Sequence, residues 1–232
     1  MTPATSEQHD LAPDELIREV ALRAGPGRLL VAVDGVDGSG KTRFAGGLRT
    51  RLELARPVVV IHLDDFLHPR EVRHARGRNS PEGFWLDSYD YGAIRQWVLD
   101  PLGPRGDGWY RRATYDVHTE QAVESRPMKA PDDALVLIEG MFLHRDELAS
   151  SWDTSFFLDA AFAETTRRMA SRDGTAPDPS HPTNRRYVEG QRMYFRACRP
   201  WRRATWVLDN GNPESPTLIE GSDSFAARDS AG

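Results

Sequence analysis

VDGVDGSGKT, residues 33–42, sets flexible glycines directly before a lysine and a threonine. Its spacing fits G-x-x-x-x-G-K-[ST], the pattern of a loop that binds phosphate. Glycines in such a loop let backbone N–H groups surround a phosphate, and the following helix turns its positive end toward it. Lys41 would supply a cation for the terminal phosphates, and the Thr42 hydroxyl would be a ligand for magnesium. The predicted phosphate-binding residues are Gly35, Val36, Asp37, Gly38, Ser39, Gly40, Lys41 and Thr42.

The residues on both sides of this loop support the prediction. RLLVAVD (28–34) is a short apolar run of the kind found in buried parallel strands. After the loop, the apolar residues recur at the spacing of one helix face; they are Phe44, Leu48, Leu52 and Ala55. A glycine-rich strand-to-helix turn with a chance lysine is the alternative, but the strand and the helix stand where phosphate binding needs them.

Apolar runs and helical patterns alternate along the rest of the chain. The predicted strands after the loop are 57–65, 134–140, 154–160 and 205–210. The predicted helices are 13–24, 93–99, 162–170 and 187–198, with a small hairpin in 109–126 and irregular chain over 66–89. Buried strands that alternate with helices predict an α/β fold, with a parallel five-stranded sheet flanked by helices on both faces.

This pattern divides the chain into three parts. Residues 1–27 are predicted to be an N-terminal extension that contains one helix, and 28–212 to be the phosphate-binding domain. Residues 213–232 are polar and low in apolar content, which predicts a disordered tail.

Composition and charge exclude several classes of protein. With 232 residues, 39% hydrophobic residues and a formal net charge of −5, the chain can form a proper core but has no bulk attraction for nucleic acid. Cys198 is the one cysteine, so no disulfide can form within the chain, which fits a reducing compartment. No apolar run approaches membrane-spanning length, and no basic-then-apolar segment begins the chain. We therefore expect a cytoplasmic protein with no nucleic-acid or membrane partner.

Acidic side chains stand at the ends of two further predicted strands. Ligands of parallel α/β sheets bind at the carboxyl ends of the strands, and Asp64, Asp65 and Glu139 stand at such ends. Magnesium needs oxygen ligands, of which one or two carboxylates suffice, and Glu139 suits that role. Asp64 could share the metal shell, or it could orient and deprotonate an acceptor hydroxyl. Asp65 could instead cap the following turn.

Five short stretches together resemble the uridine kinase and phosphoribulokinase-like group of P-loop kinases. They are GVDGSGKT (35–42), LDDF (63–66), YDVH (115–118), IEG (138–140) and RRMASRDG (167–174). The resemblance extends over roughly residues 28 to 210, nearly the whole predicted domain. It implies a P-loop NTPase fold with a small acceptor-binding hairpin and a lid. It also implies ATP and Mg²⁺ as cofactors, and transfer of the γ-phosphoryl group to a hydroxyl of a small molecule.

The resemblance also implies roles for individual residues. Asp64 falls on the catalytic base and Glu139 on the magnesium-binding acid, beside Lys41 of the phosphate loop. The nearest match to the aspartate that holds ribose hydroxyls is Asp87. The residues that match the base pocket are Tyr115, Asp116 and His118. On this reading the acceptor is the 5′-hydroxyl of uridine or cytidine.

Arginines near the predicted lid are candidates for phosphate contacts. Arg168 and Arg172 are four residues apart and share a helix face, where two cations repel unless an anion lies between them. We therefore expect both to bind ATP. Arg185 and Arg186 begin the next predicted helix, an unfavourable end for cations, and Arg186 is a candidate to reach the substrate across the closed lid.

Departures from the family pattern leave the acceptor open. Asp37 replaces a small residue, Leu67 replaces a tyrosine, and the lid sequence GTAPDPSHPTNRR (174–186) lacks the usual Arg-Gly-Arg pattern. The alternatives are a kinase for nicotinamide riboside, pantothenate, glycerate or a sugar phosphate, and a nucleotide-dependent regulatory ATPase. The sequence contains no Asn-Lys-x-Asp stretch for reading guanine. The choice between ATP and GTP, and whether the chain forms a homo-oligomer, stay open.

Overall fold

The structure is a computed structural model that describes residues 19–20 and 27–231. The helix expected in the N-terminal extension lies outside the described residues, apart from Glu19 and Val20, which are helical.

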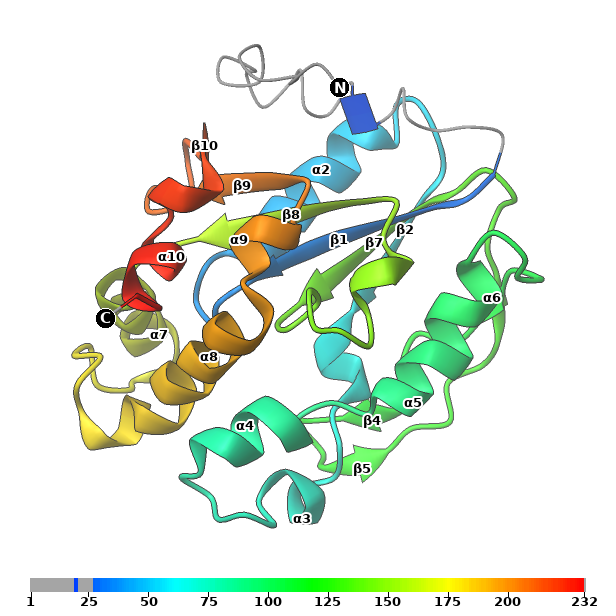
Figure 1. Cartoon of the computed structure of the whole chain (residues 1–232). Coiled ribbons are helices and arrows are strands. Elements are labelled where there is room, and N and C mark those ends of the chain that lie inside the picture. The colour runs from blue at the N-terminus through cyan, green and yellow to red at the C-terminus, as the bar shows by residue number, and fades with distance from the viewer. Residues whose placement is uncertain (1–18, 21–26, 232) are drawn as a thin grey trace.

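A six-stranded sheet forms the centre of the molecule, in the order β10-β9-β8-β1-β7-β2 (Figure 1). Its strands are β1 (Leu29–Gly35), β2 (Val58–His62), β7 (Leu135–Gly140), β8 (Thr154–Asp159), β9 (Trp206–Asp209) and β10 (Thr217–Ile219). The five strands other than β10 are parallel and match the five predicted runs, with β1 extending one residue beyond its run, so the predicted parallel sheet is confirmed. The expected number of strands is corrected from five to six because β10 adds an antiparallel edge to β9.

Residues 213–231 are ordered in the structure, so the prediction of a disordered tail is wrong. They form β10, a turn of 3₁₀-helix (Gly221–Asp223) and α10 (Phe225–Asp229). Polar contacts hold this segment: the carboxylate of Asp159 accepts hydrogen bonds from the backbone N–H groups of Phe225 (2.6 Å) and Ala226 (3.1 Å). Arg192 pairs with Asp229 at 2.9 Å. Apolar contacts hold it as well, since Ala226 is buried and the ring of Phe225 packs edge-on against Phe162. These apolar residues are few and stand among polar ones, so they carry little hydrophobic signal in the sequence.

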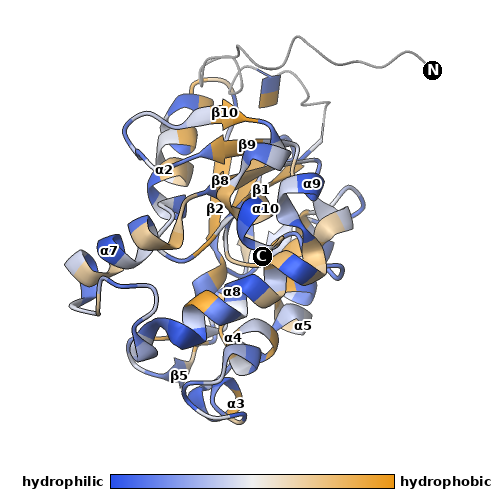
Figure 2. Ribbon diagram, turned by 60° about the vertical axis from the view of Figure 1, so that its left-hand side comes forward, coloured by the Kyte–Doolittle hydropathy of each residue, from blue (hydrophilic) through white to orange (hydrophobic). Residues whose placement is uncertain are grey.

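Helices cover both faces of the sheet, each over its own core. Successive residues of a strand point to opposite faces. On β1, Val31 and Val33 pack against α2 (Lys41–Leu52), whereas Leu30 and Ala32 belong to the larger core on the other face. That larger core is built from α4 (Pro81–Asp87), α5 (Tyr91–Ile94), its continuation over 95–102, α8 (Arg185–Cys198) and α9 (Pro200–Arg203). Figure 2 shows the strands as the most hydrophobic part of the ribbon, between helices whose outer faces are hydrophilic.

The stretch 66–89, expected to be irregular, contains two short helices. They are α3 (Arg70–Arg73) and α4. Ser80 caps α4 by accepting a hydrogen bond from the Gly83 N–H at 3.0 Å. Phe84 and Trp85 of α4 are buried against α8. Hydrophobic burial and a helix cap therefore order a stretch that looks like a loop in composition.

Two pairs of short strands and a lid segment complete the fold. The predicted hairpin in 109–126 is present as β4 (Tyr115–Asp116) paired with β5 (Gln121–Ala122), and β3 (Trp109–Tyr110) pairs with β6 (Met128–Lys129). The lid joins α7 (Phe162–Asp173) to α8. No helix in the described part of the chain is long and apolar enough to cross a membrane.

Candidate functional site

Three neighbouring strands bring their carboxyl ends to one edge of the sheet. The register places His62 of β2 and Val33 of β1 on either side of Glu139 of β7. The phosphate loop follows β1, and a single 3₁₀ turn (Leu63–Phe66) carrying Asp64 and Asp65 follows β2. The sequence prediction that glycines and carboxylates meet at this edge is therefore confirmed.

The phosphate loop has the backbone geometry that its glycines permit. Gly38 and Gly40 adopt left-handed conformations, with φ of 74° and 93°. A Cβ atom at Gly38 would lie 2.7 Å from the carbonyl oxygen of Thr165 in α7, so no larger residue fits without a shift of the backbone. Lys41 is the first residue of α2, and its Nζ donates to the carbonyl oxygen of Val36 at 2.9 Å. The ammonium group thus lies against the backbone of the predicted phosphate loop.

Thr42 and Glu139 form an oxygen-rich pair beside this loop. The Thr42 hydroxyl donates to Oε1 of Glu139 at 3.0 Å, and Nδ1 of His62 lies 2.6 Å from the same oxygen. Burial opposes ionisation of Glu139, but hydrogen bonds from His62 and Thr42 and the charge of Lys41 outweigh it and lower the pKa of this carboxyl. An ionised carboxylate beside a hydroxyl is a donor set that fits Mg²⁺.

His62 is a member of this site that the sequence analysis missed. Its hydrogen bond to Glu139 raises the pKa of the imidazole, with burial acting in the opposite direction. The ring is about half exposed and stands at the end of β2, two residues before Asp64. The sequence feature that could have indicated it is a histidine at the end of a buried apolar run.

The two aspartates of the turn after β2 face different neighbours. Asp64 is exposed, and its Oδ1 accepts a hydrogen bond from the hydroxyl of Tyr89 at 2.7 Å. Its charge acts on Asp37 of the phosphate loop and on Arg172 of α7. Burial raises the pKa of Asp65, and Asp116 in the β4–β5 hairpin adds to this shift. Asp64 is therefore the carboxylate on the phosphate-loop side.

Asp37 and Arg172 connect the phosphate loop with the end of α7. Nη2 of Arg172 lies 3.8 Å from Oδ1 of Asp37 and pairs more closely with Asp173, at 2.6 Å. Burial raises the pKa of Asp37, although the charges of Lys41 and Arg172 act to lower it. Arg172 is thus at the predicted phosphate site, where acidic neighbours hold it.

Arg168 has a different environment. Its guanidinium donates to the carbonyl oxygens of Gly38 (3.2 Å), Asn210 (2.9 Å) and Gly211 (2.8 Å). Its Nε donates to Oε1 of Glu164 at 2.9 Å. Arg168 and Arg172 lie on the same helix, as the spacing predicts, but the donors of Arg168 are directed to main-chain oxygens of the loop and of the chain after β9.

No protein-family model and no curated protein sequence matches the chain. A structure described as a possible uridine kinase from Bacillus stearothermophilus matches with a TM-score of 0.67 and 24% identity, over 84% of this chain and 95% of its own. Phosphoribulokinase from Rhodobacter spheroides matches with a TM-score of 0.56 and 16% identity, over 82% and 74% of the two chains. D-Glycerate 3-kinase from Cryptococcus neoformans matches with a TM-score of 0.50 and 13% identity, over 76% and 87%.

The chain has a P-loop kinase fold. The resemblance to the uridine kinase and phosphoribulokinase group, inferred from short motifs, is confirmed at the level of the fold. In this P-loop kinase fold, Lys41, Thr42, Glu139 and Asp64 stand at the edge of the sheet where the glycine-rich loop lies.

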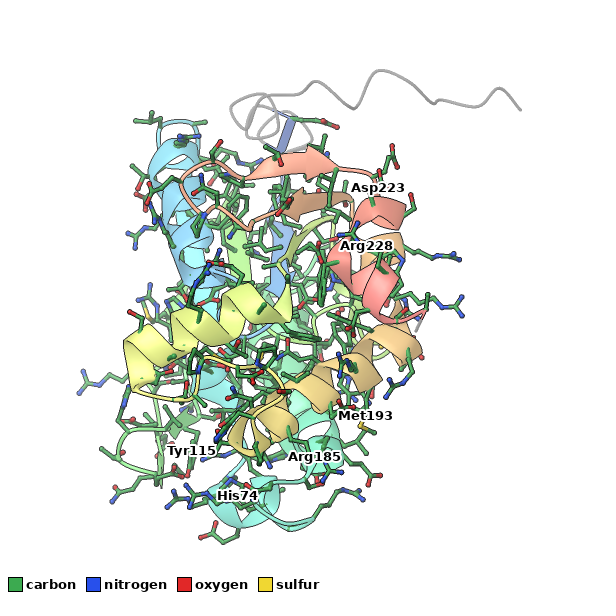
Figure 3. The ribbon with its side chains drawn as sticks, turned by 90° about the vertical axis from the view of Figure 1, so that its left-hand side faces the viewer. His74, Tyr115, Arg185, Met193, Asp223 and Arg228 are labelled. Carbon is green, nitrogen blue, oxygen red and sulfur yellow. The ribbon has the colours of Figure 1, made fainter. Side chains whose placement is uncertain are left out.

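The predicted acceptor-side residues of this P-loop kinase fold lie around the β4–β5 hairpin and α4. Tyr115 is buried, and its hydroxyl donates to Oε2 of Glu120 at 2.7 Å. His118 is exposed at the tip of the hairpin. Asp87 accepts a hydrogen bond from Nε of Arg76 at 2.9 Å. Figure 3 shows Tyr115 at the end of the molecule formed by α3, β4 and the first turn of α8. Asp87 and Tyr115 thus have protein partners here.

Arg186 is held inside this end of the P-loop kinase fold. It is 7% exposed, and its guanidinium donates to the carbonyl oxygens of Arg78 (3.0 Å), Ser80 (3.4 Å) and Arg73 (3.3 Å). The sequence suggested that Arg186 reaches the substrate across the lid. The observed contacts join the first turn of α8 to the chain between α3 and α4.

We expect Arg186→Met to act mainly on stability. The change removes the donors to three main-chain oxygens, and a loss of this kind lowers the free energy of unfolding by about 2–4 kcal/mol. Urea denaturation measures this value, and calorimetric titration with the active acceptor measures substrate binding. A wild-type unfolding midpoint combined with lost substrate binding would instead support the role suggested by the sequence.

Proposed function

We propose that this chain is an ATP-dependent kinase that transfers the γ-phosphoryl group to a hydroxyl of a small molecule. One observation supports this most strongly: the phosphate loop, a hydroxyl–carboxylate pair and a separate exposed carboxylate share one sheet edge. The pair is Thr42 and Glu139, 3.0 Å apart, and the separate carboxylate is Asp64. A nucleotide switch needs the first two features, whereas an acid aimed at an acceptor is specific to transfer.

The residues of this edge divide the work of phosphoryl transfer. Backbone N–H groups of the phosphate loop and the start of α2 hold the phosphates. Lys41 leaves its contact with Val36 and neutralises charge on the transferred group. Thr42 and Glu139 would hold Mg²⁺, which when bound screens the negative charge of the phosphates. Asp64 accepts the proton of the acceptor hydroxyl, and the Tyr89 hydroxyl fixes the orientation of its carboxylate.

The lid closes the site in this proposal. Arg172 exchanges its acidic partners Asp37 and Asp173 for the phosphates of bound ATP. The lid chain is tied to the fold by Thr166, which donates to the Pro177 carbonyl at 2.7 Å, and by Asn184, which donates to the Ala176 carbonyl at 2.8 Å. A closed lid excludes water, which would otherwise hydrolyse ATP without transfer.

We propose uridine or cytidine as the acceptor, phosphorylated at the 5′-hydroxyl. Tyr115 and His118 in the hairpin, together with Asp87, match the nucleoside pocket of the family that the motifs resemble. In this proposal, binding of the nucleoside releases Asp87 from Arg76 and Tyr115 from Glu120. The protein would work in the cytoplasm with Mg²⁺-ATP as donor.

The charge of α3 and its surroundings favours a second candidate, an anionic acceptor. Burial lowers the pKa of the His74 imidazole, and the charges of Arg186, Arg73, Arg70 and Arg78 act in the same direction. Arg73 pairs with Glu120 at 2.8 Å. Among the described residues, neither Arg70 nor Arg78 has an acidic partner within 4.0 Å. Unpaired arginines beside an acceptor site suit a carboxylate or a phosphate, as in glycerate or a sugar phosphate.

A screen of acceptors distinguishes the candidates. Purified protein with Mg²⁺-ATP is incubated with uridine, cytidine, nicotinamide riboside, pantothenate, glycerate or a sugar phosphate, and ADP is measured. We expect ADP production to rise at least about tenfold over the rate without acceptor for one nucleoside. A rise with glycerate or the sugar phosphate alone would support the anionic acceptor. A slow rate that none of the compounds changes would indicate a regulatory ATPase.

A further inference from the structure

We infer that Asn210 and Arg168 form a brace that holds the phosphate loop with its N–H groups turned toward the nucleotide. This inference rests on the proposed function and adds two positioning residues to it. Asn210 directly follows β9 and is 2% exposed. Its Nδ2 donates to the carbonyl oxygen of Ser39 at 2.5 Å, in the middle of the loop.

The geometry of the peptide bond explains why this contact matters. In a planar trans peptide, the carbonyl of one residue and the N–H of the next point in opposite directions. Asn210 holds the Ser39 carbonyl on the side of β9, so the Gly40 N–H is directed to the opposite side of the loop. Within the described residues, the Gly40 N–H has no hydrogen-bond partner. This N–H is thus free for a phosphate oxygen before the nucleotide arrives.

Arg168 fixes both the loop and the residue that braces it. Its Nη1 donates to the Gly38 carbonyl, and its Nη2 donates to the carbonyls of Asn210 and Gly211. One guanidinium therefore joins α7, the phosphate loop and the chain after β9. Gly38 and Gly40 are left-handed and flexible in isolation, so the loop needs such outside contacts to keep one conformation.

Two roles of Arg168 are separable. If Arg168 contacted a phosphate directly, it would act independently of Asn210. The fold losses of ADP affinity in the two single variants would then multiply in the double variant. A brace makes them partners, because Arg168 holds the backbone of Asn210 and Asn210 holds the loop. The hydrogen bonds of Arg168 to three carbonyl oxygens favour the brace.

The test is the dissociation constant for AMP divided by the dissociation constant for ADP. This ratio reports how much the loop contributes to binding the second phosphate. Asn210→Leu removes the donor without adding charge. We expect it to lower the ratio about tenfold, the effect of one well-placed hydrogen bond, while the unfolding temperature stays within about 3 °C. The matched control is Asn212→Leu, because Asn212 is exposed and its side chain accepts a single local hydrogen bond among the described residues, from the Glu214 N–H at 3.2 Å.

A second variant keeps the inference open to refutation if Asn210→Leu does not fold. Arg168→Gln should lower the same ratio, and the double variant should lose no more than the worse single variant. If wild-type protein binds ADP and the ratio is unchanged in both single variants, or if their losses multiply, the brace is refuted and the proposed function stands. If wild-type protein binds no ADP, the proposed function fails and this inference fails with it.

Discussion

Replacing Lys41 with alanine is expected to lower kcat about 10³-fold, the effect of removing one fixed charge-stabilising group from a transition state. Lys41 stands at the first position of α2, and its ammonium contacts only the Val36 carbonyl at 2.9 Å among the hydrogen bonds of the described residues. Because that contact is local, the free energy of unfolding should change by less than about 1 kcal/mol. Steady-state kinetics with Mg²⁺-ATP and the acceptor found by screening measures the first value, and urea denaturation measures the second.

Arg43→Ala is the matched control for Lys41. Arg43 is a cation on the same helix, but it is exposed and pairs with Glu214 at 2.5 Å. We expect this variant to keep kcat within about twofold of wild type, because a surface ion pair contributes little. Wild-type turnover by the alanine variant at position 41 would refute the role of the ammonium group.

Asp64→Asn is expected to lower kcat by about 10²- to 10⁴-fold, the range for loss of a general base. Asparagine is the same size and can still accept the hydrogen bond from Tyr89, so the turn after β2 should stay intact. Asp64 lies in the turn after β2 and does not belong to the predicted phosphate loop. ATP affinity should therefore stay within about threefold. Calorimetric titration and single-turnover kinetics separate the two quantities.

Asp65→Asn serves as the comparison for Asp64. Its backbone carbonyl accepts from the Thr114 N–H at 2.9 Å, and the charges of His62 and of Asp116 in the hairpin both act on its carboxyl. We expect this variant to change the KM for the acceptor more than kcat. A loss of transfer at Asp65 with normal transfer at Asp64 would exchange the two assignments. A collapse of ATP affinity in Asp64→Asn with normal residual transfer would refute Asp64 as the base.

Much of the fold could be predicted because buried parallel strands are nearly continuous apolar runs. The five parallel strands, and the meeting of the phosphate loop with Asp64 and Glu139, follow from this pattern alone. The sequence did not predict β10 because this strand has three residues, of which only Leu218 and Ile219 are apolar. The other tail residues that pack against the core, Phe225 to Ala227, are a short group among polar residues. In α4, the sequence Ser80-Pro81 is a cap followed by proline at the first helical position, and reading it would have predicted that helix.

The directions of the arginine side chains could not be predicted. Helical spacing places Arg168 and Arg172 on one face, but tertiary contacts turn Arg168 to main-chain oxygens and Arg172 to carboxylates. Carbonyl oxygens are present at every residue and leave no signature in a sequence. The same holds for Arg186, whose partners lie more than 100 positions away along the chain. The role of Asn210 could not be predicted for the same reason, because its partner is a backbone carbonyl of the loop.

The most direct test of phosphoryl transfer at this sheet edge is a mass balance of the products. Wild-type protein, Mg²⁺-ATP and the active acceptor are incubated, and ADP, phosphorylated acceptor and inorganic phosphate are measured by mass spectrometry and phosphate assay. The account predicts phosphorylated acceptor in equal amount to ADP, and at least about a hundredfold less of both products from Asp64→Asn in the same time. ADP matched by inorganic phosphate, with no phosphorylated compound from any acceptor, would contradict it.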